Sequence, residues 1–283
     1  MRDNDREGGR AEPAFGEGGV VAGLPVNQPK GVLLDLDGTV WDDELRPYPG
    51  AADAVRWLRE SDIAVRFVTN TTRLTRAMLA DMLSERGIPA SPRDVFTATL
   101  AGVVWLRERG LERVAVLLPD RALEELSGFE LVEAHPQALL VGDLGPGWSF
   151  EVMNRAFHWL LDGAEFLALH RNPYWKTEGE QLLDAGAFVA ALEYASGRTA
   201  TLVGKPSPVL FEAAARSLGL EPKQLVMVGD SLDADIAGAC AAGCPSVLVR
   251  TGRFDAAELA STSTPPDAVV GSIQELPATL RMP

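Results

Sequence analysis

Strand-like and helix-like segments alternate along most of this chain, and no other feature restricts the fold as strongly. A buried strand-like run at 32–36 precedes an amphipathic segment at 51–61, and a strand-like run at 63–69 precedes a helical segment at 72–87. Parallel strands need helical crossovers of this kind, whereas antiparallel strands are joined by short turns. We therefore predict an α/β fold whose core is a Rossmann-like, doubly wound parallel sheet.

The same alternation returns late in the chain, after a middle region that has strands and helices of its own. The late segments are strands at 199–204, 225–230 and 245–250, and helices at 209–220 and 233–243. We expect residues 30–110 and 198–283 to form the core, and residues 111–197 to form a second α/β domain inserted into it. Residues 1–29 are polar and Gly-rich and are predicted to be a disordered tail.

Composition and charge exclude several classes of protein. The chain of 283 residues has a net charge of −14, from 26 Lys and Arg against 40 Asp and Glu, which argues against binding to nucleic acid. No apolar run approaches the roughly 20 residues that cross a bilayer, and the N-terminus lacks the pattern of a secretion signal, so no membrane partner is expected. The two cysteines, Cys240 and Cys244, are too few for a disulfide scaffold, and a cytoplasmic location is predicted.

Charged and hydroxyl side chains follow the apolar strands at the point where each strand ends. The stretch GVLLDLDGTV, residues 31–40, puts Asp35 and Asp37 one residue apart at the end of the first apolar run. Such carboxylates must meet water, a cation or a hydrogen-bond donor. Later strand ends and one loop add further polar residues, namely Thr69, Asn70, Lys205, Asp230 and Asp235. Because ligands bind beyond the carboxyl ends of strands in an open α/β sheet, we predict that these side chains line one crevice.

The carboxylates predict a site for a divalent cation in this crevice. Asp35 and Asp230 would share Mg²⁺, which proteins hold through one or two carboxylates together with substrate phosphate and water. If the chain leaves the strand after Leu36, Asp37 swings aside and leaves its carbonyl oxygen for the metal. Two aspartates at a strand end are also common without any metal, because aspartate side chains hydrogen-bond to the backbone of turns.

The remaining side chains predict that the crevice binds and cleaves a phosphoryl group. Thr69, the backbone N–H groups of Asn70 and the residue after it, and Lys205 would together bind a dianion. Asp35 would attack phosphorus and form an aspartyl-phosphate. Asp37 would protonate the leaving oxygen and then activate the water that cleaves the intermediate. Each segment by itself also has an ordinary interpretation. The threonines would cap the following helix, and the lysine would be a solvated surface side chain.

Four segments resemble, in sequence and in order, the four motifs of the haloacid dehalogenase superfamily of phosphohydrolases. The segments are DLDGT (35–39), VTNTT (68–72), GKPSP (204–208) and GDSLDAD (229–235). The stretch between the second and third segments is similar to the large α/β cap of subfamily IIA. The resemblance implies that residues 111–197 form such a cap domain.

The resemblance also implies a role for each site residue. Asp35 would be the nucleophile and Asp37 the acid/base, and Asp35, Asp37 and Asp230 would hold Mg²⁺. Thr69, Asn70 and Lys205 would bind the phosphoryl group, while Asp235 would support the lysine or a metal-bound water. The expected substrate is a small phosphorylated metabolite, with pyrophosphate and phospho-amino acids among the candidates. Caps of this kind also imply a homodimer.

Three other functions stay open at this point. The same aspartate would serve a dehalogenase, although displacement of a halogen from carbon needs neither Mg²⁺ nor a second acid. A phosphoaspartate signalling protein would gather similar residues, although receiver domains are far shorter and carry no inserted domain. A protein that binds phosphate compounds with little turnover would keep the same binding residues.

Residues of the inserted domain are candidates for substrate selection. The segment HRNPYWK carries His170, Tyr174, Trp175 and Lys176, which are predicted either to face the crevice or to be packing residues. The other two histidines, His135 and His158, have no visible partner in the sequence. His158 lies among apolar neighbours on a predicted helix, and we expect it to be structural.

Overall fold

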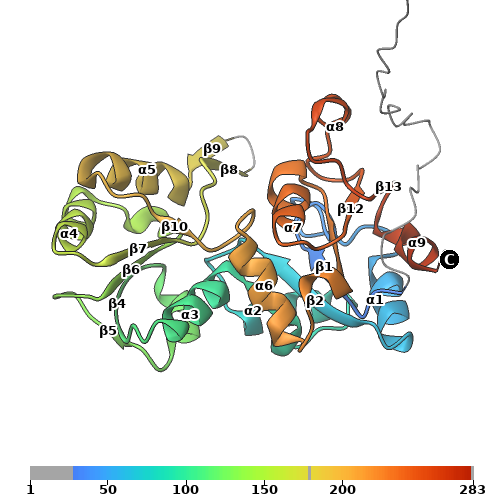
Figure 1. The fold of residues 1–283 in the computed structure, drawn as a ribbon, viewed down its shortest axis with the longest axis horizontal. Helices are drawn as coiled ribbons and strands as arrows, with labels where there is room; N and C mark the ends of the chain where they lie inside the picture. The colour runs from blue at the N-terminus through green and yellow to red at the C-terminus, as the bar shows by residue number, and fades with distance from the viewer. Residues whose placement is uncertain (1–27, 178–179, 282–283) are drawn as a thin grey trace, which may run out of the picture.

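The computed structural model describes residues 28–177 and 180–281, and within them two parallel sheets that lie next to each other (Figure 1). The chain builds part of the six-stranded sheet, drawn on the right, crosses into the five-stranded sheet on the left, and then returns. The predicted disordered tail lies, as far as residue 27, outside the described residues.

The six-stranded sheet has the order β13-β12-β11-β1-β2-β3, and every neighbouring pair is parallel. Its strands are β1 (Gly31–Asp35), β2 (Ala64–Thr69), β3 (Val95–Thr97), β11 (Leu225–Gly229), β12 (Ser246–Val249) and β13 (Ala268–Val270). From β1 the sheet grows in one direction through β2, and in the other direction through β11 after the chain returns. The space between β1 and β11 is therefore a topological switch point, where open α/β sheets bind ligands.

Helices cover both faces of this sheet because its strands carry apolar side chains on both faces. On one face Val32 and Leu34 pack in a cluster with residues of α1 and α2. On the other face Leu33 and Met227 pack with residues of α3 and α6. The helices of this part are α1 (Ala51–Glu60), α2 (Arg76–Glu85), α3 (Ala98–Glu108), α6 (Pro208–Ser217), α7 (Gly238–Ala241), α8 (Ala256–Ser261) and α9 (Leu276–Leu280). The predicted doubly wound α/β fold is confirmed.

The five-stranded sheet has the order β10-β7-β6-β4-β5 and is also parallel. Its strands are β4 (Arg113–Leu117), β5 (Glu130–Leu131), β6 (Ala138–Val141), β7 (Glu165–Ala168) and β10 (Thr201–Leu202), and α4 (Phe150–Leu161) and α5 (Ala185–Ser196) pack on one face. Because β10 pairs with β7, this sheet continues past Gly197, and the predicted boundary moves a few residues later. We call the part of the chain that carries this sheet the cap.

Local structure differs from the sequence prediction at several places. An antiparallel hairpin, β8 (Tyr174–Thr177) with β9 (Glu180–Leu183), was not predicted. The segment predicted to be helical from residue 72 stays a loop until Thr75, whose hydroxyl accepts a hydrogen bond from Met78 N at 3.2 Å and so caps α2. The predicted helix at 233–243 begins with the π-helical turn Leu232–Ala237. Among the described residues, none of the helices has the length and apolar character of a membrane span.

Candidate active site

Three carboxylates meet at the switch point of the six-stranded sheet. Asp35 ends β1 and Asp230 follows β11, which is the parallel neighbour of β1. Asp235 lies on the π-helical turn that comes next in the chain. Oxygens of the three carboxylates lie within 4.8 Å of one another, and all three side chains are buried. The fold therefore gathers the acidic residues that the sequence placed at two separate strand ends.

Lys205 reaches into this cluster from the loop before α6. Its Nζ donates hydrogen bonds to Asp35 Oδ1 at 2.5 Å and to Asp235 Oδ1 at 2.7 Å, and the residue is only 5% exposed. Burial lowers the pKa of the Lys205 ammonium, but Asp235 and Asp35 outweigh that effect, so its pKa lies above the ordinary value. The lysine is therefore held as a cation between two carboxylates.

The buried charges of this site do not cancel. Burial first, and then the carboxylate of Asp235, raise the pKa of Asp35 well above its usual range. Burial and Asp235 also raise the pKa of Asp230 to about 6. One ammonium against three carboxylates leaves two negative charges without a partner when all of them ionise. A divalent cation with a preference for oxygen ligands fits this charge and these donors.

Two glycines leave room for the carboxylate of Asp230. Gly38 has φ +81 and Gly252 has φ +60, and a Cβ on either residue would lie 2.0 Å from Asp230 Oδ2. The same oxygen accepts a hydrogen bond from Arg253 N at 2.6 Å. The backbone around Asp230 thus fixes where its carboxylate points. Gly252 and Arg253 were not among the predicted site residues, because nothing in their local sequence indicates a contact with Asp230, which lies 23 residues before Arg253.

Asp37 lies beside the buried cluster and not within it. Its side chain is exposed, and its Oδ1 accepts a hydrogen bond from Trp41 Nε1 at 2.7 Å. Trp41 is buried, so its indole holds the carboxylate from a fixed position. No local pattern selects Trp41 as a partner of Asp37, although it lies only four residues later in the chain. The arrangement leaves Asp37 oriented and open to solvent.

Thr69 and Asn70 connect the end of β2 to the lysine loop. Thr69 is buried, and its Oγ1 accepts a hydrogen bond from Thr71 N at 3.0 Å. The side chain of Asn70 makes two hydrogen bonds with the backbone of Lys205, accepting from its N at 2.8 Å and donating to its O at 2.9 Å. Both functions of the Asn70 amide are thus used to position the lysine loop. The donors that this leaves for a ligand are the O–H of Thr69 and the N–H groups of the loop other than that of Thr71, which already donates to Thr69 Oγ1.

The candidate residues of the cap have different surroundings. His170 is buried and contacts Thr72 of the core, and the ring of Trp175 lies 5.2 Å from the guanidinium carbon of Arg73. Tyr174 is exposed, and the side chain of Lys176 lies outside the described part of the chain. Trp175 and His170 therefore lie where the cap meets the loop after β2.

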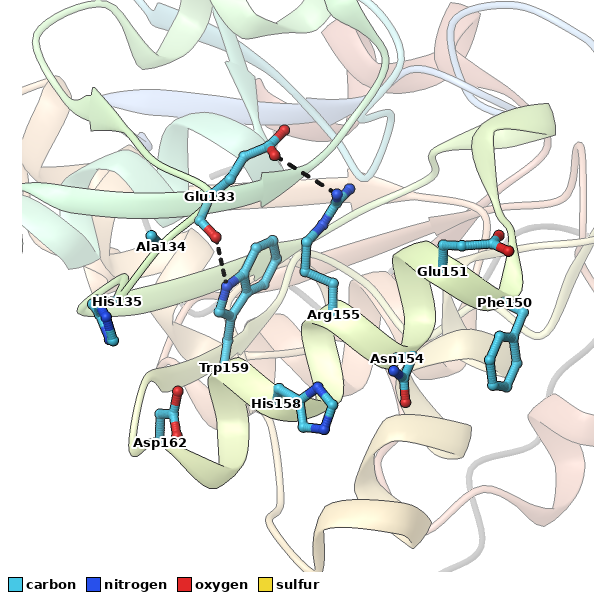
Figure 2. A pocket seen from close by; sticks show the side chains of 10 residues that line it. All are labelled: Glu133, Ala134, His135, Phe150, Glu151, Asn154, Arg155, His158, Trp159 and Asp162. Carbon is cyan, nitrogen blue, oxygen red and sulfur yellow. Dashed lines mark hydrogen bonds and ion pairs between the residues drawn. The ribbon is translucent and has the colours of Figure 1, made fainter.

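The other two histidines line a groove on the cap that is separate from this crevice. The groove is formed by α4 and by the connection between β5 and β6 (Figure 2). Figure 2 shows Trp159 donating from Nε1 to the carbonyl of Glu133, and Arg155 paired with the carboxylate of Glu133. None of the predicted site residues lines this groove. His158 is exposed on α4, although its neighbours in sequence are apolar, because that face of the helix points to solvent.

Comparisons with known proteins agree with this arrangement. A family model described as haloacid dehalogenase-like hydrolase matches residues 32–131, and one described as "HAD-hyrolase-like" matches residues 202–276. Haloacid dehalogenase-like hydrolase domain-containing protein 2 from Homo sapiens is 37% identical over 237 residues, covering 84% of this chain and 90% of that protein. Phospholysine phosphohistidine inorganic pyrophosphate phosphatase from Homo sapiens is 33% identical over 251 residues, covering 87% and 92%.

A solved structure shares the fold across both sheets. Glycerol phosphate phosphatase from Mycobacterium tuberculosis, in complex with magnesium, matches with a TM-score of 0.79 and 29% identity, covering 89% of this chain and 76% of that chain. The match therefore includes the cap as well as the six-stranded sheet. Together with relatives that are more than 30% identical over most of their length, it shows that this chain belongs to the haloacid dehalogenase-like hydrolase family.

Proposed function

We propose that this protein is a Mg²⁺-dependent phosphatase that hydrolyses a small phosphorylated metabolite through an aspartyl-phosphate on Asp35. The observation that supports this most is the contact between Lys205 Nζ and the carboxylate of Asp35 at the switch point of the sheet. A carboxylate repels a phosphate dianion, and a cation fixed beside it reduces that repulsion. The lysine therefore makes Asp35 suitable as a nucleophile.

The two aspartates of the first motif would divide the chemistry between them. A carboxylate oxygen of Asp35 forms a bond to phosphorus while the bond from phosphorus to the leaving oxygen breaks. Asp37 gives a proton to that oxygen, and later takes one from the water that cleaves the aspartyl-phosphate. The hydrogen bond from Trp41 Nε1 orients Asp37 for both transfers, and its exposed position lets leaving group and water reach it.

The loop Thr69–Thr72, which we call the phosphoryl-binding loop, would hold the transferred group together with Lys205. The hydroxyl of Thr69 and the backbone N–H groups of the loop other than that of Thr71 would supply donors, and the side chain of Asn70 keeps the lysine backbone in place. Asp35, Asp230 and the carbonyl of Asp37 would hold Mg²⁺. When bound, Mg²⁺ would offset negative charge on the phosphoryl group and on the carboxylates around it.

The class of substrate is supported by the relatives. One is named for phospholysine, phosphohistidine and inorganic pyrophosphate, and another for glycerol phosphate. A panel of sugar phosphates, nucleotides, pyrophosphate and phospho-amino acids, ranked by kcat/KM, would identify the preferred substrate. The homodimer stays a prediction, which the mass of the protein in solution would test.

The nucleophile is tested with a generic aryl phosphate, p-nitrophenyl phosphate. We expect Mg²⁺-dependent turnover by the wild type that EDTA abolishes, and a loss of at least about 10³-fold in kcat for Asp35→Asn. Asp53→Asn, on the exposed surface of α1, is the matched control and should keep wild-type activity. Retained turnover by Asp35→Asn would refute the assignment. A phosphoenzyme that persists without release of phosphate would favour a phosphoaspartate signalling protein instead.

A further inference from the structure

A second group of buried polar residues lies where the cap meets the phosphoryl-binding loop. It consists of Thr72 from the core, Asp143 after β6, His170 after β7, and Asp184, which caps α5. We call these four residues the seam cluster. All four are buried although each is polar. Buried polar groups need partners or carry a cost, so their arrangement calls for an explanation.

Thr72 is the member through which the core touches the cap. Its Oγ1 accepts a hydrogen bond from Asp143 N at 2.9 Å. The same oxygen lies 3.5 Å from His170 Nε2, at the outer limit of a hydrogen bond. One hydroxyl of the core thus faces two cap residues that follow neighbouring strands of the cap sheet.

His170 uses only one side of its ring. Nε2 lies 3.5 Å from Thr72 Oγ1 and 3.7 Å from Asp184 Oδ1, whereas Nδ1 has no hydrogen-bond partner among the described residues. Burial lowers the pKa of His170, which favours a neutral ring with one donor and one acceptor nitrogen. The carboxylate of Asp184 is itself fixed, because its Oδ1 accepts a hydrogen bond from Ala185 N at 2.7 Å. The ring is therefore placed against Thr72 from the rigid start of α5.

The phosphoryl-binding loop is held at both of its ends. At one end the side chain of Asn70 is bonded to the backbone of Lys205. At the other end Thr72 meets Asp143 and His170 of the cap. The two anchors are close together, because a Cβ on Gly204 would lie 2.1 Å from the carbonyl oxygen of Leu169 and 2.7 Å from Asn70 Oδ1. The contact of the cap at His170 and the contact of the lysine loop at Asn70 therefore involve the same short loop.

We propose that His170 is a positioning residue of the active site, which holds Thr72, and with it the phosphoryl-binding loop, against the cap through Nε2. The inference rests on the proposed phosphatase function and extends it, because the cap would then set the geometry of the loop without touching the reacting atoms. Both distances from Nε2 are longer than an ordinary hydrogen bond, and binding of a phosphoryl group should shorten one of them.

Two substitutions separate the nitrogens of the ring. The amide of glutamine reaches the position of Nε2, whereas the amide of asparagine reaches only that of Nδ1. His170→Gln should therefore keep kcat/KM for p-nitrophenyl phosphate within about 3-fold of wild type, and His170→Asn should lower it on the order of 10- to 100-fold. Thr72→Val removes the hydroxyl, and with it both the contact to His170 and the acceptor for Asp143 N, so it should lower kcat/KM at least as much as His170→Asn. His158→Gln, at an exposed position of the same cap, is the control and should have no effect.

A double-mutant cycle tests the contact itself. If Nε2 acts through Thr72, the double variant of His170→Asn and Thr72→Val should lose no more activity than Thr72→Val alone. Additive losses would overturn the proposal. A loss of activity in His170→Gln with activity kept in His170→Asn would also overturn it, since Nδ1 would then be the atom that matters. Equal losses in both variants would overturn it as well, because the shape of the ring and not the position of one nitrogen would then matter.

Affinity for inorganic phosphate, measured by calorimetry on the same folded variants, tests the loop without requiring turnover. We expect the weakening to follow the order of the activity losses, with His170→Gln close to wild type. Unchanged affinity in His170→Asn and Thr72→Val would overturn the proposal. A wild-type protein that binds phosphate but hydrolyses no phosphate compound would refute the proposed function instead, and the binding order would still decide the role of His170.

Discussion

Replacing Lys205 with methionine should destabilise the fold as well as stop catalysis. Methionine keeps much of the length of the side chain and removes the ammonium that lies between Asp35 and Asp235. The buried cluster then has three carboxylates and no cation of its own. Removing one partner of a buried ion pair costs about 3–5 kcal/mol, because the other charge stays buried without compensation.

The expected shift in melting temperature follows from the size of the protein. In a chain of roughly 250 folded residues, 1 kcal/mol lowers Tm by about 2–4 °C, so Lys205→Met should melt about 6–20 °C below wild type in the absence of divalent cations. Thermal unfolding followed by circular dichroism at neutral pH measures this. Lys223→Met is the matched control, because Lys223 pairs with Glu221 on the surface and its side chain is 75% exposed.

A second substitution tests the reasoning from charge. Asp235→Asn should destabilise the wild type, where it removes a partner of Lys205, but should stabilise the Lys205→Met variant, where it removes an uncompensated charge. Equal melting temperatures for Lys205→Met and Lys223→Met would refute the electrostatic account of the cluster. The same sign of effect for Asp235→Asn in both backgrounds would refute it as well.

Two further outcomes are expected. Gly38→Ala and Gly87→Ala both place a Cβ at positive φ, which costs roughly 1–2 kcal/mol of stability, but only the Cβ at position 38 would meet Asp230. We therefore expect kcat/KM to fall at least about 10-fold in Gly38→Ala and to stay at the wild-type level in Gly87→Ala. Full activity of Gly38→Ala would contradict this. Burial raises the pKa of the Cys244 thiol to about 12, so iodoacetamide at pH 9 should alkylate the exposed Cys240 and spare Cys244 until the chain unfolds. Equal labelling rates in the folded protein would argue against that shift.

The fold class could be predicted from the sequence because its signals are local. The run at 32–36 is apolar except for Asp35, and the segment at 51–61 carries apolar residues at helical spacing. The pattern within each segment therefore indicates whether it is a buried strand or an amphipathic helix. The rule that ligands bind at the carboxyl ends of parallel strands then predicts that Asp35 and Asp230 lie at one edge of the sheet. The weakest predictions concerned short elements. A strand was predicted at 199–204, but its place in the cap sheet depends on the pairing of Thr201–Leu202 with β7. The hairpin β8–β9 was not predicted, because its strands are too short to show a period.

What only the tertiary structure decided is which polar groups touch. Lys205 bonds to Asp35 across 170 positions of sequence and to Asp235 across 30, and no local pattern specifies such a contact. Trp41 as the partner of Asp37, Arg253 as the partner of Asp230, and His170 beside Thr72 are of the same kind. The sequence by itself determined which side chains end the strands, because backbone period and burial are encoded segment by segment. The contacts among those side chains depend on how distant segments pack, and packing is a property of the whole fold.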